Sequence, residues 1–428
     1  MAGDNKFVVV ANRLPVDRTE SGWQASPGGL VAALAPVLRA HAGCWVGWPG
    51  EPDARVEPFE FEGISLHPVA LSRWDFENFY EGFSNSTLWP LYHDLIVTPQ
   101  YVAQWWEAYE TVNATFAAAV ASVAAHGATV WVQDYQLQLV PGMLKALRPD
   151  VTIGFFLHIP FPAPALFQQL PWRDEILEGL KGCDLIGFQR HTDEDNFRLL
   201  TDDIRTGTFP ISIDSGEIAT ATQHQVNALR GAVGSPRHLL LGVDRLDYTK
   251  GIGHRIKAYG ELLADGDLDV DHDILVQVAS PSRERVESYK VLREQVEGMV
   301  GHLNGQYDTM GHTAIRYLHH GYPFEEMVAL YLATDVMLVT SLRDGMNLVA
   351  KEYVASHADG SGALVLSEFT GAATQLTQAY LCNPHDNQSI CDAIVRAMEE
   401  PIETRRERMK AMWEHVEVND VNHWANTF

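Results

Sequence analysis

Basic residues, cysteines and long apolar runs are all scarce in this chain. Its 428 residues hold 31 lysines and arginines against 56 aspartates and glutamates, a formal net charge of −25. Such an excess of negative charge argues against nucleic acid or an anionic membrane as a partner. It also makes the few basic residues informative, because a chain that binds phosphate has to gather its cations at one site.

Cysteine content and the shortage of apolar runs narrow the class of protein further. The first residues lack a signal-peptide pattern, and no apolar run approaches the roughly 18 residues of a membrane span. The cysteines show neither the spacing of a metal site nor the dense pattern of a disulfide framework, which is typical of reduced cytoplasmic thiols. We therefore expect a cytoplasmic protein without a membrane partner. The four cysteines are Cys44, Cys183, Cys382 and Cys391.

Short apolar strands alternate with longer helical periods along the chain, as in doubly wound α/β folds. The length and the 46% content of hydrophobic residues favour two domains. The strand-like segment 209–214 is typical of a crossover between them. The predicted strands are residues 7–10, 44–48, 65–69, 129–133, 152–157, 185–188, 238–243, 273–278, 314–317, 336–339 and 363–366. The predicted helices are residues 30–40, 102–125, 252–263, 284–304, 324–332, 389–398 and 405–428.

Residues 343–355, with the sequence RDGMNLVAKEYVA, follow an apolar run and form the first candidate site. Asp344 and Gly345 interrupt the apolar pattern, and a helix-like period begins near Asn347. Free N–H groups and the positive end of the dipole make such a helix start an anion site. Glu352 lies about two turns further, where a carboxylate can accept hydrogen bonds from a ribose. For the Asp-Gly pair on its own, an ordinary strand-to-helix corner is the favoured explanation.

The loop at residues 244–251 carries two cations directly after another predicted strand. Arg245 offers a planar fork to phosphate oxygens and Lys250 a movable point charge, so that both can hold one ligand without a metal. A solvated loop would explain an isolated pair of this kind, but the position after a core strand favours a phosphate clamp. The acidic run 267–273 lies in a turn and indicates a surface loop rather than a metal site. We therefore predict no metal and no cofactor.

Nine segments resemble, in the same order, those of the α,α-trehalose-phosphate synthases, a family of retaining glycosyltransferases with the GT-B fold. The resemblance covers nearly the whole chain. It implies two doubly wound, Rossmann-like domains that face each other across a cleft, with the C-terminal helix crossing back to the N-terminal domain. The nine segments are residues 11–15, 28–30, 80–85, 88–90, 131–135, 155–162, 245–251, 281–283 and 343–355.

The resemblance also assigns roles to the domains and to individual residues. Residues 1–212 with 413–428 are the acceptor domain, which binds glucose 6-phosphate, and residues 213–412 are the nucleotide-sugar donor domain. The acceptor is assigned to Arg13, Tyr80, Trp89, Asp134 and Arg283. The donor is assigned to Gly29, Arg245, Lys250, Asn347, Leu348 and Glu352. Catalysis is assigned to His158, Arg245, Lys250 and Asp344.

The residue types are compatible with these roles, although most have a plainer explanation. Arginine forks hold a phosphomonoester, and a tyrosine hydroxyl or tryptophan N–H adds a directional donor. Asp134 and His158 end successive predicted strands, where ligands bind in open α/β sheets. Outside the family, however, a histidine on an apolar strand is usually a satisfied core residue, and Tyr80 and Trp89 would more often be core aromatics.

The activity implied by the resemblance is glucose transfer from a UDP, GDP or ADP sugar to glucose 6-phosphate. The product would be α,α-trehalose 6-phosphate, formed by a metal-free front-face substitution in which Arg245 and Lys250 stabilise the departing diphosphate. A homo-oligomer is a possible assembly. One rival is a related GT-B coupling enzyme with another acceptor, but such relatives tend to lack the RLDYTKG loop. The other is a non-catalytic sugar-phosphate sensor, which turnover of glucose 6-phosphate would exclude.

The polar segment 14–29 lies between two stretches assigned to the acceptor. It shows no apolar period that would pack it as a helix or strand. We therefore expect a mobile loop that becomes ordered over glucose 6-phosphate when both substrates are bound.

Overall fold

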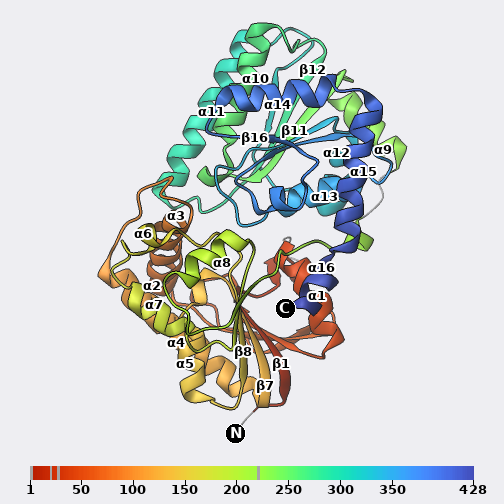
Figure 1. Cartoon of the computed structure of the whole chain (residues 1–428). Helices are drawn as coiled ribbons and strands as arrows, with labels where there is room; N and C mark the ends of the chain where they lie inside the picture. The colour runs from red at the N-terminus through yellow and green to blue at the C-terminus, as the bar shows by residue number, and fades with distance from the viewer. Residues whose placement is uncertain (1–2, 20–21, 27–28, 219–221) are drawn as a thin grey trace. The chain divides into compact units, whose positions relative to one another are not determined.

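The chain forms two compact α/β units in a computed structural model that describes residues 3–19, 22–26, 29–218 and 222–428 (Figure 1). Unit 1 comprises Met1–Ile211 together with Trp424–Phe428, and unit 2 comprises Ser212–His423. Each unit is built on a largely parallel sheet with helices packed around it. The predicted α/β class with Rossmann-like units is thereby confirmed.

Unit 1 contains an eight-stranded sheet in the order β10-β9-β8-β7-β1-β4-β6-β5. Adjacent strands are parallel except for the antiparallel pair β5 and β6. The middle of β1 is fully buried, as expected for a strand covered on both faces of a sheet. The strands are β1 (Asn5–Arg13), β4 (Cys44–Trp48), β5 (Phe59–Phe61), β6 (Ile64–Pro68), β7 (Ala124–Gln133), β8 (Thr152–Phe156), β9 (Leu185–Phe188) and β10 (Thr206–Thr208).

The helices of unit 1 include an unusual π-helix, η1 (Phe76–Leu88), which carries Tyr80. Helices of this kind are rare and occur often at functional sites. The last turns of the chain, in α16 (Val421–Thr427), lead into unit 1. The other helical elements are α1 (Gly29–Ala40), α2 (Arg73–Asp75), α3 (Trp89–Tyr92), α4 (Ala103–Val123), η2 (Tyr135–Leu137), α5 (Val140–Leu147), α6 (Pro164–Phe167), α7 (Arg173–Leu180) and α8 (His191–Arg198).

The C-terminal residue packs on the sheet of unit 1. The ring of Phe428 stacks on Trp131 at a centroid distance of 4.8 Å. A Cβ atom at Gly154 would lie 2.8 Å from this ring, and one at Gly187 would lie 2.6 Å from it. Both glycines therefore make room for the aromatic side chain, which explains how the end of the chain is held in unit 1.

The segment after β1 forms a β-hairpin, so the expectation that it has no regular structure was wrong. Strands β2 (Val16–Thr19) and β3 (Gly22–Ala25) are antiparallel, with Val16 opposite Ala25. Val16 is fully buried, and the ring of Trp23 stacks on Phe59 at 5.0 Å. Two apolar side chains and backbone pairing are enough to build this short ribbon, which the polar composition concealed. Residues 20–21 and 27–28 of the segment lie outside the described residues.

Unit 2 contains a six-stranded parallel sheet in the order β13-β12-β11-β14-β15-β16. Helices α10, α11 and α14 pack with one face of the sheet in a large apolar core, while α9, α12 and α13 cover the other face (Figure 1). The strands are β11 (His238–Arg245), β12 (Asp273–Ser280), β13 (Ile315–Leu318), β14 (Val336–Val339), β15 (Ala363–Ser367) and β16 (Tyr380–Cys382). The helical elements are η3 (Ser215–Glu217), α9 (Gln223–Ala232), η4 (Tyr248–Lys250), α10 (Ile252–Asp265), α11 (Glu287–Tyr307), α12 (Phe324–Ala333), α13 (Leu348–Ser356), η5 (Gly371–Thr374), α14 (Asn387–Glu399) and α15 (Ile402–Val418).

The two units differ from the domains expected from the sequence mainly in the C-terminal segment. The chain passes from unit 1 to unit 2 between Ile211 and Ser212, and it returns at Trp424. Residues 413–423 therefore lie in unit 2, whereas the sequence placed 413–428 in the acceptor domain. The acceptor and donor roles of the two domains remain predictions.

Within the described ranges, no helix combines the length and the apolar character needed to cross a membrane.

Each sheet has a point where the order of its strands reverses, between β1 and β7 in unit 1 and between β11 and β14 in unit 2. Ligands of open α/β sheets bind outside the carboxyl ends of the strands at such points. Arg13 ends β1, and Asp134 directly follows β7. Arg245 ends β11, and Asp344 lies in the loop after β14. The predicted residues thus occupy the positions that the topology favours for binding.

Candidate functional site

The two candidate loops of unit 2 meet through an ion pair. Lys250 ends the short helix η4, and its Nζ lies 2.6 Å from Oδ2 of Asp344, which comes from the other loop. The side chains of both residues are largely buried, with 12% and 15% of their surface exposed. A short pair with little exposure is screened weakly by water, so the two loops are electrostatically coupled.

Asp344 accepts hydrogen bonds from several groups of its own loop. Besides Lys250, the Ser341 hydroxyl lies 3.3 Å and the Asn347 amide nitrogen 3.2 Å from the same carboxylate oxygen. Asn347 in turn caps helix α13, since its side-chain oxygen accepts the N–H of Ala350 at 2.9 Å. Asp344 therefore orients the lysine and the start of the helix.

Close packing of the backbone fixes the position of both loops. Gly251 has φ of +64°, and a Cβ atom there would lie 2.1 Å from the carbonyl oxygen of Thr340. Only glycine fits this approach of the first loop to the end of β14. Asn347 has φ of +134°, a strained value for a residue other than glycine. Such strain persists where surrounding contacts hold it, and it is common at ligand sites.

The remaining donor candidates lie around this core. Arg245 is exposed at the end of β11, and Leu348 is the first residue of α13. Glu352 lies on the same helix, where its Oε2 accepts the hydroxyl of Tyr331 at 2.9 Å. Burial raises the pKa of Glu352, opposed by the Tyr331 hydrogen bond. The structure thus brings Arg245, Lys250, Asp344, Asn347, Leu348 and Glu352 together in unit 2, around the β11/β14 reversal.

Arg283 belongs to unit 2, whereas the other predicted acceptor residues belong to unit 1. Its Nη1 is 2.9 Å from Oδ2 of Asp247, a residue of the first loop. The Arg283 side chain is 5% exposed and the Asp247 side chain is fully buried. Asp247 was not among the predicted site residues. Its place between Arg245 and Lys250 was the only available signal.

In unit 1, Arg13 stands beside an aromatic group at the ends of β1 and β4. Its guanidinium lies 5.2 Å from the ring centroid of Trp48 and pairs with Asp17 at 2.5 Å. The Trp48 ring lies 6.4 Å from Tyr80, which stacks on Phe76 at 5.5 Å. Trp48 was not predicted, although its position at a strand end was visible in the sequence. The cation and the tyrosine assigned to the acceptor are therefore close together.

Trp89 and Asp134 lie on neighbouring parts of unit 1. Trp89 is buried, with its ring 5.6 Å from that of Tyr135, the residue after Asp134. Asp134 has φ of +75°, and its carboxylate accepts the backbone N–H of His158 at 3.1 Å. Gly29 begins helix α1. The carboxylate thus links the loops that follow β7 and β8.

His158 is held between two glutamine side chains. Its Nε2 lies 2.8 Å from Oε1 of Gln133, which can only accept, and its Nδ1 lies 3.4 Å from Nε2 of Gln189, which can only donate. The Gln189 amide is oriented by its own oxygen, which accepts the N–H of Ile211 at 2.8 Å. This arrangement favours a neutral imidazole protonated on Nε2. Burial lowers the pKa of His158 to about 3, in agreement.

We predict that His158 makes stability depend on pH. Since its pKa is about 3 in the folded chain against an ordinary 6.5, the unfolded chain binds more protons between these values. The contribution of the neutral imidazole to the free energy of unfolding is fully present above pH 6.5 and is lost as the pH falls toward 3. Urea unfolding midpoints measured from about pH 7.5 to about pH 4.5 should therefore fall less steeply for His158→Asn than for the unsubstituted chain.

A matched control is His224→Asn, which replaces an exposed histidine on α9 and should leave the pH slope as it is. Parallel curves for His158→Asn and the unsubstituted chain would contradict a neutral His158.

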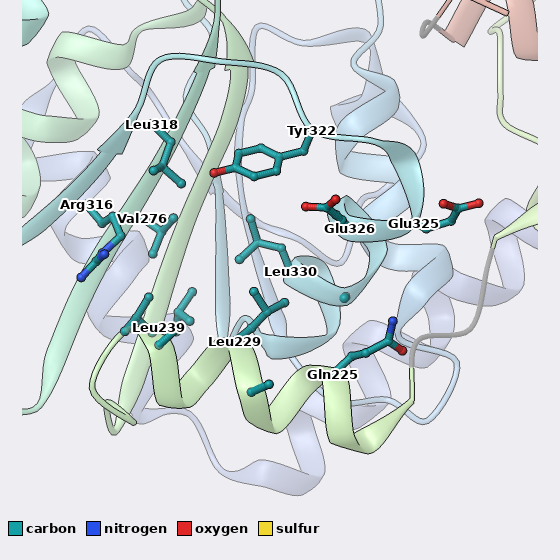
Figure 2. A pocket seen from close by; sticks show the side chains of 14 residues that line it. Gln225, Leu229, Leu239, Val276, Arg316, Leu318, Tyr322, Glu325, Glu326 and Leu330 are labelled. Atoms are coloured by element: carbon teal, nitrogen blue, oxygen red, sulfur yellow. The ribbon is translucent and has the colours of Figure 1, made fainter. Parts of the chain in front are cut away.

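A hollow elsewhere in unit 2 contains none of the predicted site residues. It has a volume of ≈ 620 Å³ and lies between α9, α12 and the strands β11 to β13. Figure 2 shows Leu229 and Leu330 on its walls, with Tyr322 and Glu326 on another side. Its lining is mostly apolar, and beside the single cation of Arg316 it carries the carboxylates of Glu325 and Glu326, which would repel a diphosphate, so we do not assign the substrates to it.

Metal ligands do not gather around the candidate residues. Within the part of the chain that the structure describes, no group of three or more histidine, cysteine, aspartate and glutamate side chains is placed to hold a metal ion. The charged groups that do converge are the cations and carboxylates of the two loops. Their arrangement suits an anionic ligand held by arginine and lysine.

Comparison with known proteins identifies the family to which these features correspond. The family model for glycosyltransferase family 20 matches residues 5–428. The chain is 53% identical over 470 residues to a trehalose-6-phosphate synthase of Mycobacterium bovis, covering 100% of this chain and 94% of that relative. Among solved structures, an α,α-trehalose-phosphate synthase (UDP-forming) from Burkholderia xenovorans in complex with glucose 6-phosphate is similar, with a TM-score of 0.91 and 33% identity, covering 99% of this chain and 98% of the other. An Escherichia coli relative bound with UDP-2-fluoro glucose has a TM-score of 0.91 and 34% identity, covering 99% and 97% of the two chains.

Proposed function

The chain belongs to glycosyltransferase family 20, as one of its trehalose-6-phosphate synthases, and from this premise we propose a specific reaction. The donor is a nucleoside-diphosphate glucose and the acceptor is glucose 6-phosphate. The product is α,α-trehalose 6-phosphate, which the family and the name of the relative support. We propose in addition that the donor's anomeric configuration is retained and that no metal takes part. We further propose that it acts in the cytoplasm, because all four cysteines are free.

The observation that carries the proposal is the contact between Lys250 and Asp344 at the strand reversal of unit 2. It joins a loop that bears Arg245 to the start of helix α13. Two cations beside the N-terminus of a helix suit a diphosphate, whose negative charge grows as it leaves the sugar. Asp344 keeps the lysine in place before the ligand arrives, which lowers the cost of reorganisation during the reaction.

The proposed step is a substitution on one face of the glucose ring. The bond between the anomeric carbon and the diphosphate oxygen breaks, and a bond to the anomeric oxygen of glucose 6-phosphate forms on the same face. The proton of the acceptor hydroxyl passes to the departing phosphate oxygen, so no other base is needed. Arg245 and Lys250 stabilise the diphosphate, and the neutral His158 serves as a polar contact to the donor sugar.

The acceptor is held through its phosphate and its hydroxyl groups. Arg13 and Arg283 bind the phosphate, Tyr80 and Trp89 add hydrogen-bond donors, and Asp134 accepts from the sugar hydroxyls. Arg13 is exposed, and its partner Asp17 is also about half exposed. Replacing the carboxylate of Asp17 by a phosphate as the partner of Arg13 therefore costs little free energy. The complex of the Burkholderia relative with glucose 6-phosphate supports this acceptor.

The donor proposal is supported by the E. coli relative, whose structure holds UDP-2-fluoro glucose. It is tested by thermal unfolding with UDP, GDP or ADP, each with and without glucose 6-phosphate. A ligand that binds only the folded state raises the melting temperature as its concentration exceeds the dissociation constant. At least one nucleotide should stabilise the chain, and the size of the shift ranks the bases. The absence of any shift at millimolar nucleotide would contradict the donor assignment.

We predict that turnover survives removal of divalent metal. Cations of the chain itself neutralise the leaving group, so dialysis against EDTA should change kcat by less than about twofold. The check is product formation before and after dialysis, with magnesium added back to a parallel sample. Loss of activity that magnesium restores would contradict the metal-free mechanism.

A further inference from the structure

Asp247 divides its two carboxylate oxygens between two tasks. Its Oδ1 accepts the N–H of Thr249 at 3.0 Å and the hydroxyl of Thr249 at 2.9 Å, which closes the turn η4. Its Oδ2 accepts from Nη1 of Arg283 at 2.9 Å and from the hydroxyl of Tyr289 at 3.0 Å. One residue thus shapes the turn that carries Lys250 and at the same time holds an arginine that follows β12.

Tyr289 contacts the Arg283 side chain in two ways. Its guanidinium lies 5.4 Å from the ring centroid of Tyr289 and is also hydrogen-bonded to the hydroxyl of that residue. Its backbone has φ of +47°, in the left-handed region that residues other than glycine rarely adopt. Such a conformation is strained and persists only where the surroundings hold it. Asp247 is an acidic partner of the guanidinium in this arrangement.

The pairing of the two charges is obligatory in this environment. Burial raises the pKa of Asp247, but Arg283, Arg245 and Lys250 outweigh that effect and lower it to about 2. The carboxylate is therefore charged at any neutral pH. Removing one partner of a buried ion pair leaves the other charge without compensation, so a change at Asp247 is transmitted to Arg283.

We propose that Asp247 is a positioning residue for the acceptor, which holds Arg283 in the orientation that binds the phosphate of glucose 6-phosphate. The inference rests on the proposed function, which places Arg283 on that phosphate. The turn of Asp247 also carries Lys250, which pairs with Asp344. One turn in the donor loop thus fixes a cation for each substrate, and a substitution in that loop should change recognition of the acceptor.

The test is steady-state kinetics of Asp247→Asn, which keeps the size of the side chain and removes its charge. A hydrogen bond to a charged group contributes about 1.5 to 3 kcal/mol, so the KM for glucose 6-phosphate should rise about tenfold or more. The KM for the nucleotide sugar should stay within about twofold. The preference for glucose 6-phosphate over glucose should fall by the same factor as the rise in KM, because glucose has no phosphate.

Two further variants separate positioning from loss of stability. Asp273→Asn is the matched control: Asp273 is also a fully buried carboxylate with a pKa of about 2, paired with Arg237 and His238 at the opposite ends of β11 and β12. It should leave both KM values unchanged. Tyr289→Phe removes one hydroxyl from the same carboxylate oxygen, and it should raise the acceptor KM by a smaller factor even where Asp247→Asn fails to fold.

Combination with Arg283→Ala gives the decisive comparison. Once Arg283 is absent, Asp247→Asn should raise the acceptor KM no further, because both substitutions act through one guanidinium. Independent, additive effects, a larger rise in the donor KM, or the same profile for Asp273→Asn would overturn the inference. If Arg283→Ala itself left the acceptor KM unchanged, the proposed function of Arg283 would fail instead, which distinguishes the two outcomes.

Discussion

Arg245→Ala and Lys250→Ala are each expected to lower kcat by about a hundredfold or more, equivalent to about 3 kcal/mol of transition-state stabilisation. Both residues lie on the loop after β11, and Lys250 is already oriented by Asp344 at 2.6 Å. Their interaction strengthens as negative charge develops on the diphosphate, so the loss should appear in kcat as well as in KM. Initial rates with saturating glucose 6-phosphate and varied nucleotide sugar provide the check.

The matched controls are Arg237→Ala and Lys257→Ala. Arg237 precedes β11, at the opposite end from Arg245, and pairs with Asp273. Lys257 lies on α10 and is 62% exposed. Neither substitution should alter kcat by more than about twofold. Near-normal rates for Arg245→Ala or Lys250→Ala would refute the cationic clamp.

Arg13→Ala should lower kcat/KM for glucose 6-phosphate by about a hundredfold while leaving the nucleotide KM nearly unchanged. A guanidinium that forms paired hydrogen bonds to a phosphate contributes about 1.5 to 3 kcal/mol, with each 1.4 kcal/mol giving a factor of ten. Glucose without the phosphate should be a very poor acceptor for the unsubstituted chain, and Arg13→Ala should not weaken its use further. Rates with both acceptors measure the effect.

The control for Arg13 is Arg39→Ala on helix α1. Arg13 pairs with Asp17 and is 43% exposed, while Arg39 pairs with Glu62 and is 42% exposed, so the two differ mainly in position. The control should behave as the unsubstituted chain does. Equal use of glucose and glucose 6-phosphate would show that the acceptor assignment is incorrect.

The elements that the sequence predicted well are those with strong apolar patterns. The runs around Val8, Leu240 and Met337 are fully buried in β1, β11 and β14, because parallel strands covered on both faces need continuous apolar sequence. The loops after these strands could also be located, since the end of an apolar run marks where a strand stops. For this reason Arg245 and Lys250 were predicted at the edge where the structure places them.

Short elements that depend on tertiary contacts leave a sequence pattern that is too weak to predict them. The strands β5, β10 and β16 have three residues each, below the length at which alternation can be recognised. The π-helix η1 differs from an α-helix in its hydrogen bonds rather than its composition, so no residue type announced it. The β2 and β3 hairpin depends on the packing of Trp23 against Phe59, which is distant in the sequence.

The partners of the predicted site residues could not be predicted either. Gln133 and Gln189 hold His158, yet one ends β7, the other directly follows β9, and neither carries a charge that would draw attention. Asp247 was visible as a residue of the loop, but its pairing with Arg283 depends on how β11 and β12 lie side by side. Contacts of this kind follow from the register of the sheet, which one sequence does not specify.

In the proposed reaction, this chain joins glucose from a nucleotide sugar to glucose 6-phosphate with retention and without metal. The most direct test is nuclear magnetic resonance of the product formed from a nucleoside-diphosphate glucose and glucose 6-phosphate in the presence of EDTA. We expect one disaccharide in which both anomeric protons show α couplings and the phosphate is still attached. A β-linked product, a product without phosphate, or no product with any of the UDP, GDP and ADP sugars would contradict it.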